Sequence, residues 1–210
     1  MATSQNGWSA SPNLPLRSLV VAGIPFPPGI RDDDDVATVL GYVAAQFHQR
    51  VEKLVDPGCW GYNYRANANN PYSLSNHSSG TAIDVNAPQH PNGVPTSNTF
   101  TQPEIDEVHK ILAEVGHTIR WGGDYSGTPD AMHFEVNVSK TTLAKTAEQL
   151  RKDDDMPLSD DDIEKIAKRV NQVLGDYTAK GEPRDPDNKN PKQGDARLRQ
   201  IEKQTAKEGP

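Results

Sequence analysis

The sequence predicts an α+β fold, with a small antiparallel sheet, flanking helices and a C-terminal tail that is partly helical or disordered. Two kinds of segment predict the core of this fold. In three segments the apolar residues recur every three or four positions, which indicates amphipathic helices. In several shorter segments apolar and polar residues alternate, which indicates strands with one buried face. Loops rich in Pro, Gly, Asn and Ser separate these segments.

Composition divides the 210 residues into three parts. Residues 1–18 are rich in Ser, Asn and Pro and predict an irregular N-terminal arm. Residues 19–150 contain the strongly periodic segments and form the predicted globular domain. Residues 151–210 form a charged, apolar-poor tail, in keeping with a hydrophobic fraction of only 34% for the whole chain. A short helical pattern after Ser159 favours either weak self-association through this tail or a solvated, partly helical segment.

Charge and apolar patterning exclude two classes of partner. The formal charge of −7 and the pI near 5.3 argue against a nucleic-acid binder, which would present a basic face. The apolar run at residues 19–24 is far too short to span a bilayer. The N-terminus lacks the pattern of a signal peptide, so we expect the protein in the cytoplasm of the producing cell. With one cysteine, Cys59, no internal disulfide can form.

Three helices are predicted from apolar stripes and capping residues. The first follows the acidic run 31–35, where a helix cap is favoured over a calcium site, and it ends at residues 56–58. The second opens with a capping box from Thr101 to Glu104 and ends at Gly116, and the third covers residues 141–150. The positions expected to be buried are Val36, Val39, Leu40, Val43, Phe47, Val51, Leu54, Ile105, Val108, Leu112, Val115, Leu143, Ala147 and Leu150.

Strands are predicted at residues 19–24, 59–65, 81–86, 117–121 and 133–138. In the strand at 81–86, Ile83 and Val85 face the core and Asp84 faces the open side. In the strand at 133–138, His133 and Glu135 share the face opposite the apolar residues. Two strands therefore present metal-ligating side chains away from the core.

These side chains suit a metal site. His77, Asp84 and His133 are of the types that Zn²⁺ accepts, and three protein ligands leave a fourth position for water. Asp130 is a candidate base for that water, provided that the chain turns at residues 128–129. From spacing alone, a zinc hydrolase site and unconnected structural histidines are both open.

The same residues resemble the signature of a known family. Residues 75–84 match the pattern Ser-x-His-x-x-Gly-x-Ala-x-Asp of the zinc D-alanyl-D-alanine carboxypeptidase / L-alanyl-D-glutamate endopeptidase family. Asp130, in place of Glu before the last histidine, resembles the form found among phage endolysins and bacterial wall-remodelling endopeptidases. Residues 121–124 and 130–135 are similar to that family's Trp-Gly-Gly and Asp-x-x-His-Phe-Glu segments, and Tyr64-Arg65 resembles its upstream Tyr-Arg pair. The resemblance covers roughly residues 20–150.

The resemblance implies that His77, Asp84 and His133 bind one zinc ion and that Asp130 is the general base. It implies that Arg65 holds a substrate carboxylate or the developing oxyanion, which suits a planar fork of donors. A surface salt bridge is the alternative for Arg65. Ser75 is implied to contact the substrate or to support a ligand.

Together these features predict a zinc-dependent peptidoglycan peptidase that cleaves a bond of the stem peptide. We favour an L-alanyl-D-glutamate endopeptidase acting as a phage endolysin on the cell wall after release, because of Asp130 and the missing signal peptide. A D-alanyl-D-alanine carboxypeptidase is the first alternative, and a virion-associated lysin is a variant of the favoured role. A non-catalytic zinc module that binds the wall is the alternative from another class.

Overall fold

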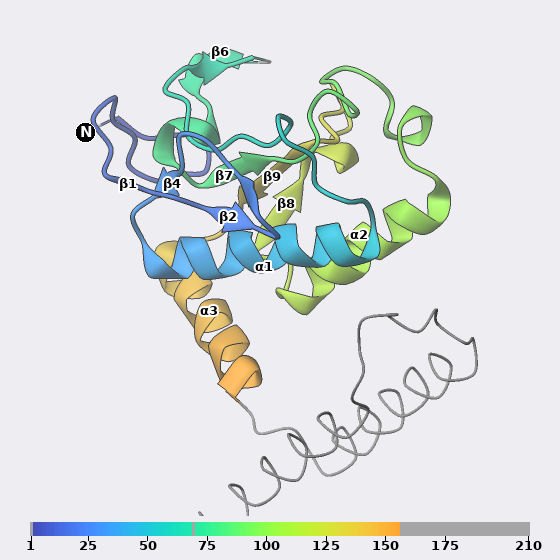
Figure 1. Ribbon diagram of the computed structural model, residues 1–210. Coiled ribbons are helices and arrows are strands. Elements are labelled where there is room, and N and C mark those ends of the chain that lie inside the picture. Colours follow the sequence, from blue (N-terminus) through green and yellow to red (C-terminus); the bar gives the residue numbers. More distant parts are fainter. Residues whose placement is uncertain (1, 69, 156–210) are drawn as a thin grey trace, which may run out of the picture. The chain divides into compact units, whose positions relative to one another are not determined.

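The computed structural model describes residues 2–68 and 70–155. The architecture of these residues is α+β, as predicted: a three-stranded antiparallel sheet and three two-stranded antiparallel pairs are combined with three α-helices. Helix α1 (Asp34–Arg50) runs beneath the sheet, with α2 (Gln102–Glu114) and α3 (Lys140–Asp155) beside it (Figure 1). The predicted tail helix and its self-association lie outside the described residues.

Helix α1 begins where the acidic run was expected to cap it. The Asp33 carboxylate accepts the N–H groups of Asp35 and Val36, and it also pairs with Lys140 of α3 at 2.7 Å. Burial alone would raise the pKa of the Asp33 carboxyl, but the hydrogen bonds from Lys140, Val36 and Asp35 lower it. Asp33 therefore joins the start of α1 to the start of α3.

Replacing Asp33 by alanine is expected to lower the free energy of unfolding by about 1–2 kcal/mol, because the helix loses its cap. Asp33→Asn keeps an acceptor oxygen and should therefore lower the free energy of unfolding by less. Since the folded pKa lies below the unfolded value, the contribution of Asp33 is present above an unfolded pKa of about 3.9 and lost as the pH falls further. Thermal unfolding of the three proteins at neutral pH and at about pH 3 measures both effects. Equal stability of the native protein and Asp33→Ala at neutral pH would contradict this assignment.

Two of the predicted strands are wrong. Residues 19–24 form a tight hairpin of β2 (Val20–Val21) and β3 (Ile24–Pro25), because Ala22 and Gly23 both have positive φ and reverse the chain. Val20 is consequently 59% exposed. A second small pair, β1 (Leu16–Arg17) with β4 (Ile30–Arg31), joins the end of the N-terminal arm to the start of α1.

Residues 59–65 form no strand beyond one isolated bridge between Trp60 and Asp84. The N–H groups of Gly61 and Tyr62 donate to the carbonyls of Pro27 and Gly29, so this segment packs on another loop and not into a sheet. A Cβ at position 61 would lie 2.1 Å from the Gly29 carbonyl oxygen, which explains the glycine. The small residue at position 61 of the alternating pattern is thus required by the close approach of the two loops.

The loop expected after residue 65 contains a hairpin instead. Strands β5 (Ala66–Asn67) and β6 (Asn70–Leu74) pair with an irregular register, and Tyr72 at their outer side is 98% exposed. The hairpin is followed by the short 3₁₀ helix η1 (Asn76–Ser79). Asn and Pro depress strand propensity, so this pairing had no signal in the sequence.

The central sheet has the order β7-β9-β8, with β7 (Ala82–Asp84) and β8 (Ile119–Trp121) both antiparallel to β9 (His133–Val136). The strands are shorter than predicted. His117 has a positive φ of 53° and ends the α2 turn, and the sheet starts after it. The 3₁₀ helices η2 (Thr96–Asn98) and η3 (Gly122–Asp124) lie in the loops before α2 and after β8.

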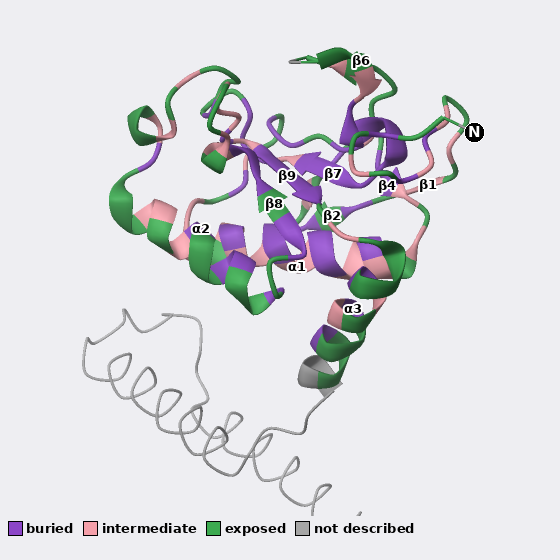
Figure 2. Cartoon of the chain, turned by 180° about the vertical axis from the view of Figure 1, so that it is seen from behind, coloured by how far each residue is buried: buried purple, intermediate pink, exposed green. Residues whose placement is uncertain are grey.

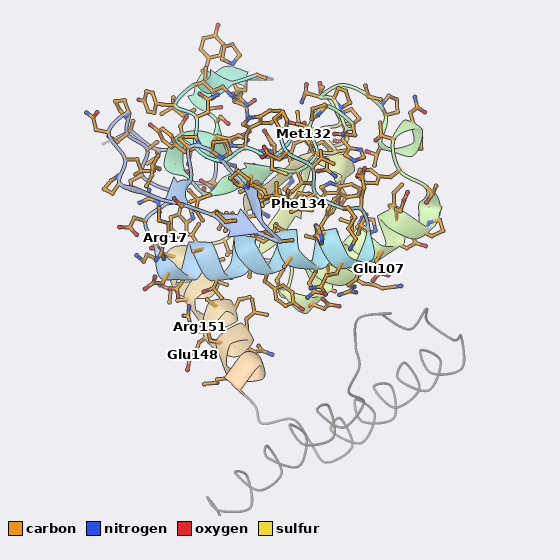
Figure 3. The ribbon with its side chains drawn as sticks, viewed as in Figure 1. Arg17, Glu107, Met132, Phe134, Glu148 and Arg151 are labelled. Atoms are coloured by element: carbon orange, nitrogen blue, oxygen red, sulfur yellow. The ribbon has the colours of Figure 1, made fainter. Side chains whose placement is uncertain are left out.

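The core lies between the sheet and α1. Phe134 of β9 packs edge-on against Phe47 of α1 with ring centroids 5.9 Å apart, and Figure 3 shows it between these two elements. Figure 2 shows the buried faces of α1 and the sheet turned toward each other. Ile83, Val85 and most of the predicted helix positions are buried, and Gly116 and the capping box of α2 take their predicted places. Helix α3 continues to Asp155, five residues beyond its predicted end.

Candidate metal centre

Strand pairing places the first two metal-ligating residues side by side. Asp84 of β7 lies directly opposite His133 of β9 in the antiparallel register. The main chain of Asp84 is also bonded on its other side, since it exchanges two hydrogen bonds with Trp60 at 2.8 and 3.0 Å. Residue 84 is therefore held between two segments, and its side chain position is set by the backbone.

His77 reaches the same point from η1. Its N–H lies 3.3 Å from the Ser75 hydroxyl oxygen, which caps the helix, and Gly80 ends it with a φ of 64°. A Cβ at Gly80 would lie 2.4 Å from the backbone nitrogen of Arg31, so this tight turn requires glycine. The Ser75 hydroxyl is thus explained by the turn that presents His77.

Each histidine has one ring nitrogen committed to an oxygen acceptor. His77 Nδ1 lies 2.6 Å from the Gly61 carbonyl oxygen, and His133 Nε2 lies 3.1 Å from a Glu135 carboxylate oxygen. Proton donation there leaves His77 Nε2 and His133 Nδ1 with free lone pairs. Both lone pairs point to the place where Asp84 also presents an oxygen.

The three facing atoms are closely spaced. His77 Nε2 lies 3.1 Å from His133 Nδ1, and Asp84 Oδ1 lies 3.2 and 3.0 Å from these two nitrogens. Ligand atoms of a tetrahedral zinc ion are roughly 3.3 Å apart, given metal–ligand distances of about 2.0–2.1 Å. Three acceptors this close repel one another unless a cation lies among them. The residues therefore fit zinc.

The charges of the site lead to the same conclusion. Burial lowers the pKa of the His133 imidazole, but the hydrogen bonds to Asp84 and Glu135 outweigh it and raise the pKa to about 10. Burial would raise the pKa of the Asp84 carboxyl, yet His77 and His133 hold it far below its usual range. A positive charge, from a proton or a metal ion, is thus strongly stabilised at this point.

Asp130 takes the turn position that the sequence predicted for it. The His133 N–H donates to the Asp130 carbonyl at 3.0 Å, and the Asp130 N–H donates to Gly122 at 2.9 Å. A Cβ at Gly122 would lie 2.3 Å from the Asp130 carbonyl oxygen, so this glycine lets the loop approach β8. Oδ1 of Asp130 is buried and has no hydrogen-bond partner among the described residues, and burial raises the pKa of this carboxyl.

The polar loop at residues 88–98 contributes a residue that sequence reasoning missed. The Asn92 side chain hydrogen-bonds the Asp130 carboxylate and lines the same cavity. Gly93 donates its N–H to the Pro129 carbonyl at 2.7 Å, which holds the two loops together. In the sequence, only the turn residues of this loop were recognisable. The contact between the loop and residue 130 forms only on folding, so no local pattern indicates it.

Two cavities meet at the metal-ligating residues. One, of about 350 Å³, is lined by Asp130, His133, Ser75 and Asn92 among others, and the second, of about 400 Å³, is lined by His77, Asp84, Trp60 and Tyr62 among others. Arg65 lines both. Met132, which precedes His133 and also lines the first cavity, lies on the side of the sheet away from α1 (Figure 3).

The other residues near the site differ in their exposure and contacts. Arg65 is exposed, and among the described residues its guanidinium makes one 3.4 Å hydrogen bond, to Ala66, and no ion pair. The salt-bridge alternative is therefore not seen in the described part of the chain. Trp121 is buried in the core against Phe134. Asp124 pairs with His109 at 2.9 Å.

The fold and this site define the class: a zinc metallopeptidase, with one candidate zinc site of His, Asp and His ligands. Residues 68–136 match the family model described as D-alanyl-D-alanine carboxypeptidase. This segment is similar to the D-alanyl-D-alanine carboxypeptidase family of zinc peptidases, which act on peptidoglycan-related peptides. The matched segment includes all three metal-ligating residues and Asp130, while Arg65 precedes it.

No curated protein and no solved structure matches the chain. Within residues 2–68 and 70–155, no helix has the length and apolar character needed to cross a membrane. The likeness to the family therefore comes from the matched segment, and the roles of individual residues come from the geometry.

Proposed function

We propose that His77, Asp84 and His133 hold one zinc ion and that Asp130 is the general base of a peptide hydrolysis. The convergence of three lone-pair atoms within 3.0–3.2 Å of one another carries this proposal. When bound, zinc supplies Lewis-acid chemistry and lowers the pKa of water toward about 7.

The role of Asp130 is supported by its free oxygen. Oδ1 is buried without a partner among the described residues, while Asn92 holds the carboxylate in place. A carboxylate in this position takes the proton of the attacking water and delivers it to the leaving amine. The raised pKa of Asp130 makes both halves of this transfer easier near neutral pH.

The proposed substrate is the peptidoglycan stem peptide, and the proposed bond is internal, between L-alanine and D-glutamate. Support for an internal bond comes from the two cavities, which both include metal-ligating residues and, apart from Arg65, are lined by different residues. An extended peptide needs space on both sides of the scissile bond, whereas a carboxypeptidase needs only a short site for the terminal residue. Arg65 lines both cavities and is placed to bind a substrate carboxylate or the oxyanion.

Two substrates separate the proposed activity from D-alanyl-D-alanine carboxypeptidase activity, which the family description favours. Purified cell walls and a synthetic stem peptide ending in D-alanyl-D-alanine are incubated with the zinc-loaded protein. We expect new amino groups and a fall in turbidity with the walls, and no free D-alanine from the peptide. Release of D-alanine without loss of turbidity would establish the carboxypeptidase instead. Zinc binding without either product would establish the non-catalytic wall module.

Replacing Arg65 by alanine is expected to lower kcat/KM about 10- to 100-fold, the value of one or two hydrogen bonds to a charged group. Arg65→Lys should recover only part of the loss, because an ammonium group cannot bind bidentately. Steady-state kinetics on soluble wall fragments measures both. Arg151→Ala, which removes a surface ion pair with Asp35 far from the site, is the control. Native kinetics for Arg65→Ala would remove this residue from the site.

We also propose that the enzyme acts as a lysin of a bacteriophage, at lysis or as part of the virion. The support is Asp130, in place of Glu before the last histidine, which resembles the form found among phage endolysins. Purified protein added to bacteria with an exposed wall should lyse them. Intact cells after prolonged exposure, together with activity on isolated stem peptides, would contradict a lytic role.

A further inference from the structure

The N-terminal arm lies against the metal centre. It contains the two-residue strand β1 and isolated bridges, and it packs on the rest of the fold, since Ser4 and Trp8 are buried. The Trp8 indole N–H donates to the Val138 carbonyl at 2.9 Å, and the Ser4 hydroxyl lies 2.7 Å from that of Ser79 in η1. The arm therefore packs against the helix that carries His77 and against the end of β9.

Asn6 makes the most specific contacts of the arm. Its side-chain amide donates to the Thr81 hydroxyl at 2.9 Å and to the Val136 carbonyl at 2.8 Å. Its backbone N–H donates to Oδ1 of Asn76 at 2.9 Å. The side chain thus anchors the residue, and the backbone points a donor at Asn76.

This donor determines which way the Asn76 amide faces. A backbone N–H can only donate, so the atom it meets must be the amide oxygen, and the amide nitrogen must lie at the other end. Nδ2 of Asn76 then donates to Glu135 Oε2 at 2.5 Å. With the amide reversed, its oxygen would face the carboxylate, and Asn6 would face a second donor.

Glu135 in turn contacts a proposed zinc ligand. The same Oε2 lies 3.1 Å from His133 Nε2, and Tyr125 provides a further hydrogen bond to the carboxylate. Glu135 and Asn76 are 5% and 3% exposed, so this path is shielded from water. A carboxylate that accepts the second N–H of a metal-binding histidine fixes the orientation of its ring.

We propose that Asn6 and Asn76 are positioning residues of the metal centre, in which Asn6 orients the Asn76 amide and Asn76 holds Glu135 against His133. This inference rests on the proposed zinc site. It makes the N-terminal arm part of the site, although the arm lies outside the segment that matches the family model.

The zinc dissociation constant of the full-length protein tests the proposal, measured by competition with a chromogenic zinc chelator. Asn76→Leu keeps the branched shape of the side chain, with two methyl groups in place of the amide oxygen and nitrogen, and removes both hydrogen bonds. We expect its zinc dissociation constant to rise about 10- to 100-fold, as for other residues that support a metal ligand. Asn6→Ala keeps the backbone N–H but removes the side-chain hydrogen bonds that hold it in place. The displaced donor should raise the dissociation constant about 2- to 10-fold.

The double variant gives the sharpest result. If Asn6 acts through Asn76, adding Asn6→Ala to Asn76→Leu should change zinc affinity no further. The absorption spectrum of the cobalt-substituted protein should change in Asn76→Leu, because the ligand geometry changes. Additive effects of the two substitutions would overturn the proposed order of contacts, and a native dissociation constant in Asn76→Leu would overturn the role of Asn76.

A general loss of stability is excluded by a control. Leu112→Ala opens a cavity in α2, away from these contacts, and should lower the melting temperature while zinc affinity stays native. If Leu112→Ala weakens zinc binding as much as Asn76→Leu does, the effect is structural and the proposal fails. A native protein that binds no zinc would refute the proposed metal site itself. A native protein that binds zinc, with unchanged variants, would refute only the role of Asn6 and Asn76.

Discussion

Replacing Asp130 by alanine is expected to lower the rate of wall hydrolysis about 10²- to 10⁴-fold, the usual contribution of a general base. Zinc should remain bound with native stoichiometry, because Asp130 is separate from the cluster of His77, Asp84 and His133. The rate should fall because, among the described residues, Asp130 has the one buried carboxylate oxygen without a hydrogen-bond partner. Rates of dye release from labelled walls, with zinc content measured on the same samples, check both parts.

Asp124→Ala is the matched control for this experiment. Asp124 lies in the same loop, but it pairs with the exposed His109 and lines neither cavity. Its replacement should leave the rate within about two-fold of native, in line with the small effect of most surface substitutions. Full activity of a zinc-loaded Asp130→Ala protein would refute the proposed base.

Removing the metal is expected to abolish hydrolysis. Incubation with EDTA should reduce the rate to background, and stoichiometric zinc should restore it, because the metal held by His77, Asp84 and His133 would lower the pKa of the attacking water. His77→Ala should not be rescued by zinc at the same concentration, since one of three ligands is lost. Far-ultraviolet circular dichroism of His77→Ala checks that the fold is retained. Hydrolysis that persists after complete removal of the metal would contradict the zinc mechanism.

Much of the fold was accessible from local patterns. The capping box at Thr101 and Glu104, the glycine at 116 and the apolar stripe of α1 from Val36 to Phe47 each act over a few residues and appear in the structure. The predicted end of the first helix, at residues 56–58, is wrong, because α1 ends at Arg50. The alternation in residues 82–84 and 133–136, together with the strand predicted at residues 117–121, also identified the three strands of the central sheet. These signals depend on the chain's own neighbours, which a sequence displays directly.

The errors lie where contacts with distant segments decide the conformation. Residues 59–65 alternate like a strand, yet Gly61 and Tyr62 give their N–H groups to residues 27 and 29. The apolar run at 19–24 is divided by a turn at Ala22 and Gly23. In neither segment does the local pattern reveal which distant backbone groups the residues contact. The alternation of side chains alone therefore predicted a longer strand than the structure contains.

For the candidate site as well, local patterns were informative and contacts between distant segments were not. The residue types and the spacing of His77, Asp84, Asp130 and His133 suggested their chemistry, and the register of β7 with β9 brings Asp84 and His133 together. Asn92 and Asn6 could not be found this way. Asparagine in a polar loop is ordinary, and its meaning depends on which buried carboxylate or amide it meets after folding.

The most direct test of the account is mass spectrometry of the peptides released from purified peptidoglycan by the zinc-loaded protein, with Asp130→Ala as the control. The proposed function predicts fragments with a new L-alanine carboxyl terminus and others with a new D-glutamate amino terminus. Their amounts should fall about 10²- to 10⁴-fold in the control. Digests that contain only free D-alanine and shortened stem peptides, or no new peptide termini at all, would contradict it.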